Sequence, residues 1–247
     1  MNDHRVKKIT ATVMMAMLLP GQVLLAQSGP QGGIVTSGAA EITQSGNVTN
    51  VNQSTDRASI NWQTFNIKPA ETVNFNQPGV SSVTLNRVIG NERSVIEGAL
   101  NANGQVFLLN SNGVLLTRGS RVNAGGFLAS TLNLSDEDFK AGRYVFQGND
   151  SNASIINQGT ISARDGGYVA LFGNTVSNQG IISATRGTVA LASGEKIRLN
   201  FDNLNNSVNS LLGVTIDEGT LNALVENRNA VYADGGRVFL TDRKSVV

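Results

Sequence analysis

Two segments of this chain carry nearly the same sequence, and this repetition limits the possible fold more than any other feature. Asn157–Leu171 reads NQGTISARDGGYVAL, and Asn178–Leu191 reads NQGIISATRGTVAL, one residue shorter before its glycine. A third, looser copy, Asn227–Leu240, reads NRNAVYADGGRVFL. Recurrence at about twenty residues is typical of a stacked repeat, in which each unit packs on its neighbours.

Short strand signals fill these repeats. Runs rich in Val, Ile and Leu, such as Gln105–Leu109 and Thr188–Leu191, are bounded by Gly and Asn. Strands this short, with recurring turns, fit a chain wound as a coil in which each turn pairs with the next, a parallel β-helix. The matching aliphatic residues of successive copies should then point into a common core: Ile161, Val169 and Leu171, and Ile182, Val189 and Leu191.

Energetics explain why the coils must stack. Each buried aliphatic side chain contributes about 1.5–3 kcal/mol, whereas ordering the backbone costs about 1–2 kcal/mol per residue. One coil of some twenty residues therefore cannot fold alone, and its neighbours must supply the missing burial.

The first 26 residues have a different character. Arg5, Lys7 and Lys8 precede the apolar stretch Ile9–Leu19, and Leu24-Leu25-Ala26 forms a cleavage site, so residues 1–26 are predicted to be a secretory signal peptide. Three of the 19 basic and one of the 18 acidic residues leave with it, which changes the formal charge from +1 to −1. This charge gives no indication of nucleic-acid binding.

Removal of the signal peptide also narrows the possible chemistry. The single histidine, His4, lies within it, and the chain has no cysteine. A Ser-His-Asp triad, a Cys-His dyad and a His- or Cys-ligated metal site are therefore excluded from the mature chain. Asp165-Gly166-Gly167 and Asp234-Gly235-Gly236 lack the spacing of calcium loops and are interpreted as turns. We predict no cofactor, metal or catalytic residue.

Two segments interrupt the repeat. Ser135–Lys140 is predicted to be a polar excursion, with a helical turn capped by Ser135. Residues 200–226 are predicted to be an insertion that forms either a short amphipathic helix or an extra-helical loop. Residues 227–247 are predicted to form a further coil, and since no cap follows it, the chain is expected to be the N-terminal part of a longer protein.

Several motifs together resemble one family. They are Asn61-Trp62-Gln63-Thr64-Phe65, Asn86-Arg87, Asn103–Val114 and Gly126–Leu132. Their order and spacing resemble the N-terminal secretion (TPS, or haemagglutination-activity) domain of two-partner-secretion exoproteins, the filamentous-haemagglutinin and high-molecular-weight-adhesin family. The resemblance is strongest over residues 33–199, within a domain that spans residues 27–247.

One family motif is altered here. The hallmark turn of the family is Asn-Pro-Asn-Gly-Ile, and this chain has Asn110-Ser111-Asn112-Gly113-Val114. Proline would pre-set one turn dihedral, so serine in its place should cost about 0.4–1 kcal/mol, mostly through the unfolded chain. Asn112-Gly113 can still supply a positive φ. A second family motif, Asn-Pro-Asn-Leu, is missing.

The resemblance implies both a fold and a function. The fold would be all-β, a right-handed parallel β-helix with an N-terminal cap and short extra-helical excursions. The domain would target the exoprotein for secretion and nucleate its folding. Its partner would be a TpsB-type outer-membrane transporter, whose periplasmic POTRA domains bind the unfolded chain and whose barrel passes it outward. The product would be exported through the periplasm and be secreted or lie on the cell surface of a Gram-negative bacterium, without stable membrane insertion.

The resemblance also assigns roles to the motifs. Asn110, Ser111, Asn112, Gly113 and Val114 would form a turn that the transporter recognises or, as we favour, that acts through folding. Asn61, Trp62, Phe65, Asn86 and Arg87 belong to the cap and family motif, with Trp62 and Phe65 closing the open end of the coil.

Other functions remain as alternatives. The chain could be a self-sufficient adhesin, and the full-length protein could bind a host-cell receptor. An autotransporter passenger would need a C-terminal membrane barrel, which this sequence lacks. A polysaccharide lyase or hydrolase would use carboxylates from different coils. The one acidic cluster, Asp136–Asp138, is contiguous, and we therefore expect no enzyme.

Overall fold

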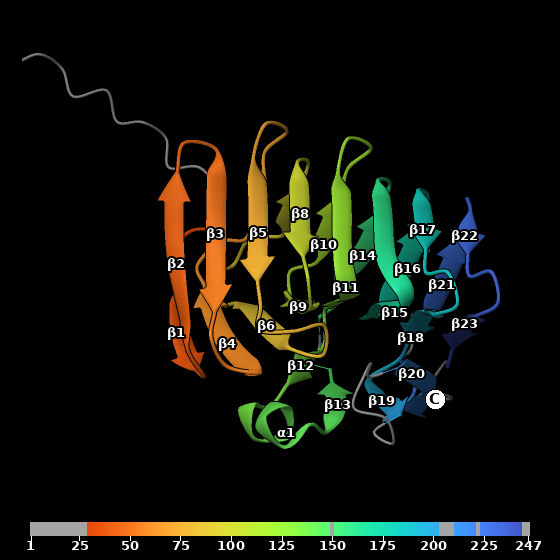
Figure 1. Cartoon of the computed structure of the whole chain (residues 1–247). Coiled ribbons are helices and arrows are strands. Elements are labelled where there is room, and N and C mark those ends of the chain that lie inside the picture. Colours follow the sequence, from red (N-terminus) through yellow and green to blue (C-terminus); the bar gives the residue numbers. More distant parts are fainter. Residues whose placement is uncertain (1–28, 149–150, 203–209, 221–222, 244–247) are drawn as a thin grey trace, which may run out of the picture.

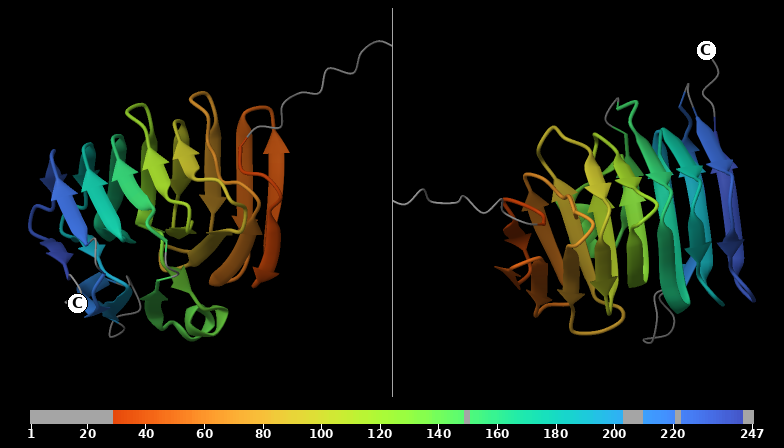
Figure 2. Two further views of the ribbon diagram at one scale, coloured as in Figure 1. Left: turned by 180° about the vertical axis from the view of Figure 1, so that it is seen from behind. Right: turned by 90° about the horizontal axis from the view of Figure 1, so that it is seen from above.

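A computed structural model describes residues 29–148, 151–202, 210–220 and 223–243. The predicted signal peptide, residues 1–26, lies outside the described residues. The described chain is a coil of parallel β-strands with three faces, seen from three directions in Figures 1 and 2. It is thus the all-β parallel β-helix that the repeat predicts.

The first two faces share one sheet, because two long strands bend from one face onto the other. These strands are β11 (Arg121–Ser130) and β15 (Thr160–Gly173). The first face holds their first halves with β3 (Val48–Gln53), β5 (Thr72–Asn76), β8 (Ala99–Ala102), β17 (Ile181–Ser183) and β22 (Val231–Tyr232). The second face holds their second halves with β4 (Arg57–Trp62), β6 (Val83–Val88), β9 (Gln105–Leu109), β18 (Thr188–Ser193) and β23 (Arg237–Asp242).

A separate sheet makes the third face. It consists of β7 (Ser94–Ile96), β10 (Val114–Leu116), β14 (Ser154–Asn157), β16 (Thr175–Asn178) and β21 (Leu224–Asn227). All of its pairings are parallel. Successive coils therefore pair on all three faces, which satisfies the backbone of each coil with the next.

The N-terminal end is capped by two antiparallel strands. β1 (Ile34–Ser37) pairs with β4, and β2 (Ala40–Ser45) pairs with β3. Because they reverse the strand direction, they end the parallel stack and cover the edges of the first coil. The fold thus has an N-terminal cap as predicted, but residues 34–45 form it, and the predicted cap residues Trp62 and Phe65 lie in the core of the coil beneath it.

The sequence repeats coincide with the stacked coils. Ile161 pairs with Ile182, Val169 with Val189, and Leu171 with Leu191. All six side chains are fully buried in one core cluster. The third copy continues the register, since Val189 pairs with Val238 and Leu191 with Leu240. Val238 and Leu240 are 47% and 50% exposed, because no coil lies beyond them in the described structure.

The asparagine that opens each copy has a structural role of its own. Asn157 Nδ2 donates to Asn178 Oδ1, and Asn178 Nδ2 donates to Asn227 Oδ1, both at 2.7 Å. Asn157 and Asn178 are fully buried. Each amide thus pairs with the amide of the next coil, so these buried polar groups are hydrogen-bonded.

Glycines line one corner of the coil, where the first face turns into the second. We call Gly104, Gly125, Gly167, Gly187 and Gly236 the glycine column. A Cβ on Gly125 would lie 2.7 Å from the carbonyl oxygen of Gly104, and the same clash with the preceding corner recurs along the column. The backbones of successive coils approach too closely at this corner for any side chain.

A second core lies outside the coil, against the second face. A four-stranded antiparallel sheet covers it, made of β12 (Asn133–Leu134), β13 (Tyr144–Gln147), β19 (Lys196–Asp202) and β20 (Ser210–Glu218). Helix α1 (Asp136–Ala141) adds Phe139 to this core. In Figure 1 these elements project below the coil.

Both predicted interruptions of the repeat lie in this second sheet. The helical turn is confirmed, because Ser135 is the N-cap of α1 and its hydroxyl accepts from the amide of Asp138 at 3.1 Å. Of the two alternatives for residues 200–226, the described residues form an extra-helical hairpin of β19 and β20 and no helix. The predicted bounds of this insertion, residues 200 and 226, differ from the observed ones. The hairpin begins at Lys196, where β19 starts to pair with β20, and Leu224 already belongs to the coil, because it pairs with Thr175 of β16. Within the described residues, no helix is long and apolar enough to cross a membrane.

Candidate functional site

The predicted motif Asn110–Val114 forms the turn between β9 on the second face and β10 on the third face. The amide of Gly113 donates to the carbonyl oxygen of Asn110 at 2.9 Å, which closes a four-residue β-turn. The amide of Asn112 donates to Oδ1 of Asn110, also at 2.9 Å. Asn at the first position and Gly at the fourth are typical of a type I turn, whose second position favours proline. Ser111 occupies that second position.

Asn110 ties this turn to the preceding coil. Its side chain is 1% exposed, and its Nδ2 donates to the carbonyl oxygen of Glu92 and to Oγ of Ser94, both at 2.9 Å. The Nδ2 of Asn112 adds a bond of 3.0 Å to the carbonyl oxygen of Gly90. The turn therefore fixes the loop that precedes β7.

The same turn also contacts the following coil. Gly113 has a φ of +98°, and a Cβ there would lie 2.8 Å from the carbonyl oxygen of Ser154. The positive φ that the sequence predicts belongs to Gly113 alone, because Asn112 has a negative φ. The hydroxyl of Ser151 donates to the carbonyl oxygen of Ser111. The motif thus connects three successive coils.

Trp62 and Phe65 lie in the first coil, beneath the N-terminal cap. Both are 1% exposed, and their rings meet edge to face with centroids 5.6 Å apart. Gly33 of the cap approaches the indole so closely that a Cβ would lie 2.5 Å from a ring carbon. The indole nitrogen of Trp62 donates to Oδ1 of Asn86, and Nδ2 of Asn86 donates to the carbonyl oxygen of Phe107 at 3.3 Å.

Arg87 joins the first coils to the excursion that carries α1. Its guanidinium donates to the carbonyl oxygen of Leu134 at 2.7 Å and to Oδ1 of Asp136 at 2.9 Å. It also reaches Oδ1 of Asn61 at 3.4 Å. Arg87 and Ser111 line one small cleft of about 190 Å³. The predicted turn, through Ser111, and the predicted cap and family motif, through Arg87, therefore meet at this cleft. Trp62 and Phe65 of the second motif lie in the coil interior.

The acidic cluster, Asp136–Asp138, is engaged in ion pairs on the surface of α1. Asp136 pairs with Arg87, and Glu137 and Asp138 pair with Arg143 at 3.0 and 2.7 Å. The hydroxyl of Ser135, followed by the guanidinium of Arg143, lowers the pKa of Asp138 below its usual value. In the part of the chain that the structure describes, no three His, Cys, Asp or Glu side chains gather as metal ligands would.

Sequence reasoning missed the partners that give these motifs their geometry. Glu92, Ser94 and Ser151 belong to neighbouring coils and carry no motif of their own. Asp136 was recognised only as part of an acidic cluster, although it binds Arg87. The coil period, applied to polar residues as well as to aliphatic ones, is the signal that could have found them.

Comparison with known proteins identifies relatives of this chain. The family model described as the TPS secretion domain matches residues 26–245. A heme/hemopexin-binding protein of Haemophilus influenzae is 33% identical over 83% of this chain, and a second protein of that name and species is 38% identical over 44%. The matches cover 23% and 12% of those proteins. This chain therefore spans less than a quarter of the length of the curated relatives it matches.

Two solved structures resemble the coil. The HMW1 secretion domain of Haemophilus influenzae has a TM-score of 0.77 and 36% identity, over 85% of this chain and 55% of that one. A filamentous hemagglutinin secretion domain has a TM-score of 0.56 and 18% identity, over 82% of this chain and 76% of that one. At that lower identity the likeness concerns the fold alone.

Proposed function

Because this chain belongs to the TPS secretion domain family of two-partner exoproteins, we propose that it directs a longer exoprotein to a TpsB-type transporter and nucleates its folding outside the cell. TPS exoproteins are secreted across the outer membrane of Gram-negative bacteria, and TPS domains work with a TpsB transporter. The proposal for this chain adds three steps: export by residues 1–26, binding of the unfolded chain by POTRA domains, and outward folding.

One observation carries the proposal, the burial of the side chains at the centre of both motifs in the folded chain, although Ser111, Asn112, Asn61 and Arg87 are only half-buried. Asn110 and Val114 are 1% and 0% exposed, and Trp62, Phe65 and Asn86 are equally hidden. A transporter could contact these side chains only before the chain folds. We therefore assign recognition to the unfolded chain, which can add a strand to an exposed sheet edge.

The folded turn has a different task in this proposal. By bonding to Glu92 and Ser94 in one coil and to Ser151 in another, it aligns neighbouring coils before their aliphatic side chains are fully packed. Such a local contact lowers the entropic cost of stacking the next coil. Folding outside the membrane would then oppose the return of the chain.

The test separates recognition from folding with one variant. Asn110→Ala should slow refolding from urea and reduce secretion through a co-expressed TpsB transporter. The same variant, kept unfolded in urea, should bind isolated POTRA domains within about twofold of the unaltered chain. The control is Asn52→Ala, an exposed asparagine of β3 that bonds only to Asn76 among the described side chains.

Two results would contradict parts of this proposal. Loss of POTRA binding by unfolded Asn110→Ala would mean that the transporter reads the motif directly. Failure of the unaltered unfolded chain to bind POTRA domains would remove the recognition step itself.

The names of the curated relatives favour an activity for the longer protein. Both are heme/hemopexin-binding proteins, and the exoprotein that contains this chain would by analogy capture haem or its carrier. The chain has no cysteine, and its one histidine, His4, lies in the predicted signal peptide. We therefore assign that binding to other parts of the exoprotein. Haem titration of the secreted full-length protein, compared with this chain alone, would test the assignment.

A further inference from the structure

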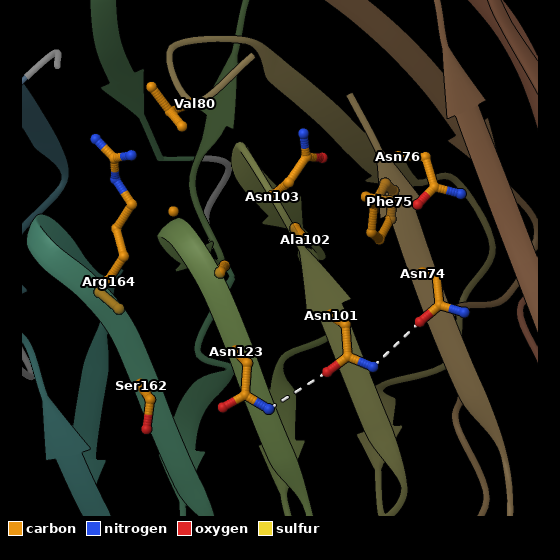
Figure 3. Close-up of a pocket in the computed structure, with 13 residues that line it drawn as sticks. Asn74, Phe75, Asn76, Val80, Asn101, Ala102, Asn103, Asn123, Ser162 and Arg164 are labelled. Atoms are coloured by element: carbon orange, nitrogen blue, oxygen red, sulfur yellow. Dashed lines mark hydrogen bonds between the residues drawn. The ribbon is translucent and has the colours of Figure 1, made fainter. Parts of the chain in front are cut away.

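An open groove of about 580 Å³ crosses the outer side of the first face, where β5, β8, β11 and β15 approach the glycine column. Figure 3 shows its lining. Its floor carries Asn74, Asn101, Asn123 and Ser162, and Val80 and Arg164 rise along one border. Apart from Arg164, the lining side chains are uncharged.

The floor of this groove is a row of paired amides. Asn74 Nδ2 donates to Asn50 Oδ1 at 3.0 Å, Asn101 Nδ2 to Asn74 Oδ1 at 3.1 Å, and Asn123 Nδ2 to Asn101 Oδ1 at 3.3 Å. We call these four residues the amide ladder. An amide can donate two hydrogen bonds and accept two. Asn74 and Asn101 each donate one hydrogen bond and accept one within the ladder. Each side chain can therefore donate one further bond to a ligand and accept one from it.

The ladder is already ordered before anything binds. Its side chains are fixed by their neighbours, so a ligand would not have to pay the usual entropy of immobilising them. Neighbouring strands lie about 4.8 Å apart, and the three amides of the ladder that line the groove, Asn74, Asn101 and Asn123, therefore extend about 10 Å across the sheet. This is a rigid, repeating row of donors and acceptors, suited to an extended molecule with many hydroxyl groups.

Arg164 gives the groove its charge preference. Its side chain is half-buried, and no carboxylate lines the groove to neutralise it. In Figure 3 the side chain reaches along the border of the groove toward Val80. A guanidinium forms strong, oriented hydrogen bonds with a carboxylate, so the charge of Arg164 favours an anionic group on the ligand.

We propose that this groove binds a short acidic oligosaccharide, with its hydroxyls on the amide ladder and a carboxylate on Arg164. Val80, half-buried at the border of the groove, supplies an apolar contact for the carbon-bound hydrogens of a sugar ring. The site goes beyond the proposed role in secretion and does not depend on it, because it requires the folded coil. It would let the secreted domain attach to an acidic polysaccharide.

The test uses isothermal titration of the purified chain with three probes of similar length. Trigalacturonate carries both hydroxyls and carboxylates, galactotriose carries hydroxyls alone, and triglutamate carries carboxylates without sugar hydroxyls. Trigalacturonate should bind saturably and at least about tenfold more tightly than either of the others, since tenfold corresponds to 1.4 kcal/mol.

Two variants locate the site, and one controls for charge. Arg164→Gln and Asn101→Ala should each weaken trigalacturonate binding by about tenfold. Arg237→Gln removes the same charge from an exposed arginine that lies outside the groove and should change the affinity by less than about twofold. Circular dichroism and thermal unfolding test whether Asn101→Ala is folded. Arg164→Gln removes no bond of the amide ladder, so it tests the site even if Asn101→Ala does not fold.

Three outcomes would overturn the proposal. The first is the absence of saturable trigalacturonate binding at millimolar concentration. The second is equal binding of triglutamate, which would indicate an anion or peptide site. The third is equal weakening by Arg237→Gln, which would indicate attraction by overall charge and no site at the groove.

Discussion

The indole nitrogen of Trp62 donates a hydrogen bond of 3.0 Å to Oδ1 of Asn86 inside the first coil, where these side chains are 1% and 0% exposed. Two motif residues 24 positions apart thus satisfy each other in the interior of the coil. A buried donor without an acceptor loses its hydration and gains nothing in return. The pair therefore explains why an asparagine occupies the interior of a central strand.

Removal of this acceptor should be costly. Asn86→Ala leaves the indole N–H of Trp62 unpaired and should lower the free energy of unfolding by about 1–3 kcal/mol. Urea unfolding followed by Trp fluorescence measures the change directly. Asn61→Ala, in the neighbouring strand, removes only the long bond to Arg87 and should cost less than about 1 kcal/mol. Equal losses in the two variants would contradict the importance of the buried pair.

A β-branched residue at Gly113 should disrupt the motif turn. Gly113→Val must adopt a φ near +98° and also meets the carbonyl oxygen of Ser154. Strain of this kind costs about 1–3 kcal/mol, and secretion should fall with stability. The matched control is Gly79→Val. A Cβ at Gly79 would meet no atom within 4 Å, and the backbone of Gly79 does not have a positive φ. Unchanged stability and secretion of Gly113→Val would show that the turn does not require glycine.

The same substitution should have different effects in two successive coils. Leu191 and Leu240 are register partners, but Leu191 is fully buried and Leu240 is 50% exposed. Leu191→Ala should cost about 2–5 kcal/mol by leaving a cavity, whereas Leu240→Ala should cost less than about 1 kcal/mol. Chemical denaturation of both variants makes the comparison. Similar losses would mean that another segment covers Leu240 in solution.

Stability should fall at high pH because of a buried tyrosine. Burial raises the pKa of Tyr168 well above its ordinary value of 10.0, and its hydroxyl donates to Oε1 of Gln105 at 2.6 Å. Above pH 10 the unfolded chain releases this proton while the folded chain retains it. The free energy of unfolding should therefore decrease with pH, by up to about 1.4 kcal/mol per unit for one tyrosine.

Tyr168→Phe provides the check on this pH dependence. It should reduce the slope of stability against pH above 10, as measured by urea unfolding at a series of pH values. Burial also raises the pKa of Tyr144, so a smaller slope should remain in Tyr168→Phe and decrease further when Tyr144→Phe is added. A slope that neither substitution changes would contradict this assignment.

The repeats allowed the coil itself to be predicted from the sequence. Ile161 and Ile182 recur with the period of the coil, and this spacing is enough to place both in one core. Ser135 could be recognised as a helix cap because capping depends only on residues nearby in the sequence.

Elements that depend on distant partners could not be predicted in this way. β19 pairs with β13, so that Leu199 lies opposite Tyr144, and no local pattern indicates a partner so far away in the sequence. The amide ladder was missed for a related reason. Asparagine is disfavoured in strands, and the bonds that Asn74 and Asn101 make to the coils on both sides come from residues more than twenty positions away.

The glycine column has a consequence for how such a chain can lengthen in evolution. From Gly125 to Gly187, each coil of the glycine column presents bare backbone both to the coil before it and to the coil after it. A tandem duplication of the DNA that encodes one coil would therefore place glycine beside glycine at both new junctions. Recombination can then add or remove whole coils without any compensating mutation at this corner. The number of coils, and with it the length of the rod, can therefore change in evolution while the glycine corner stays the same.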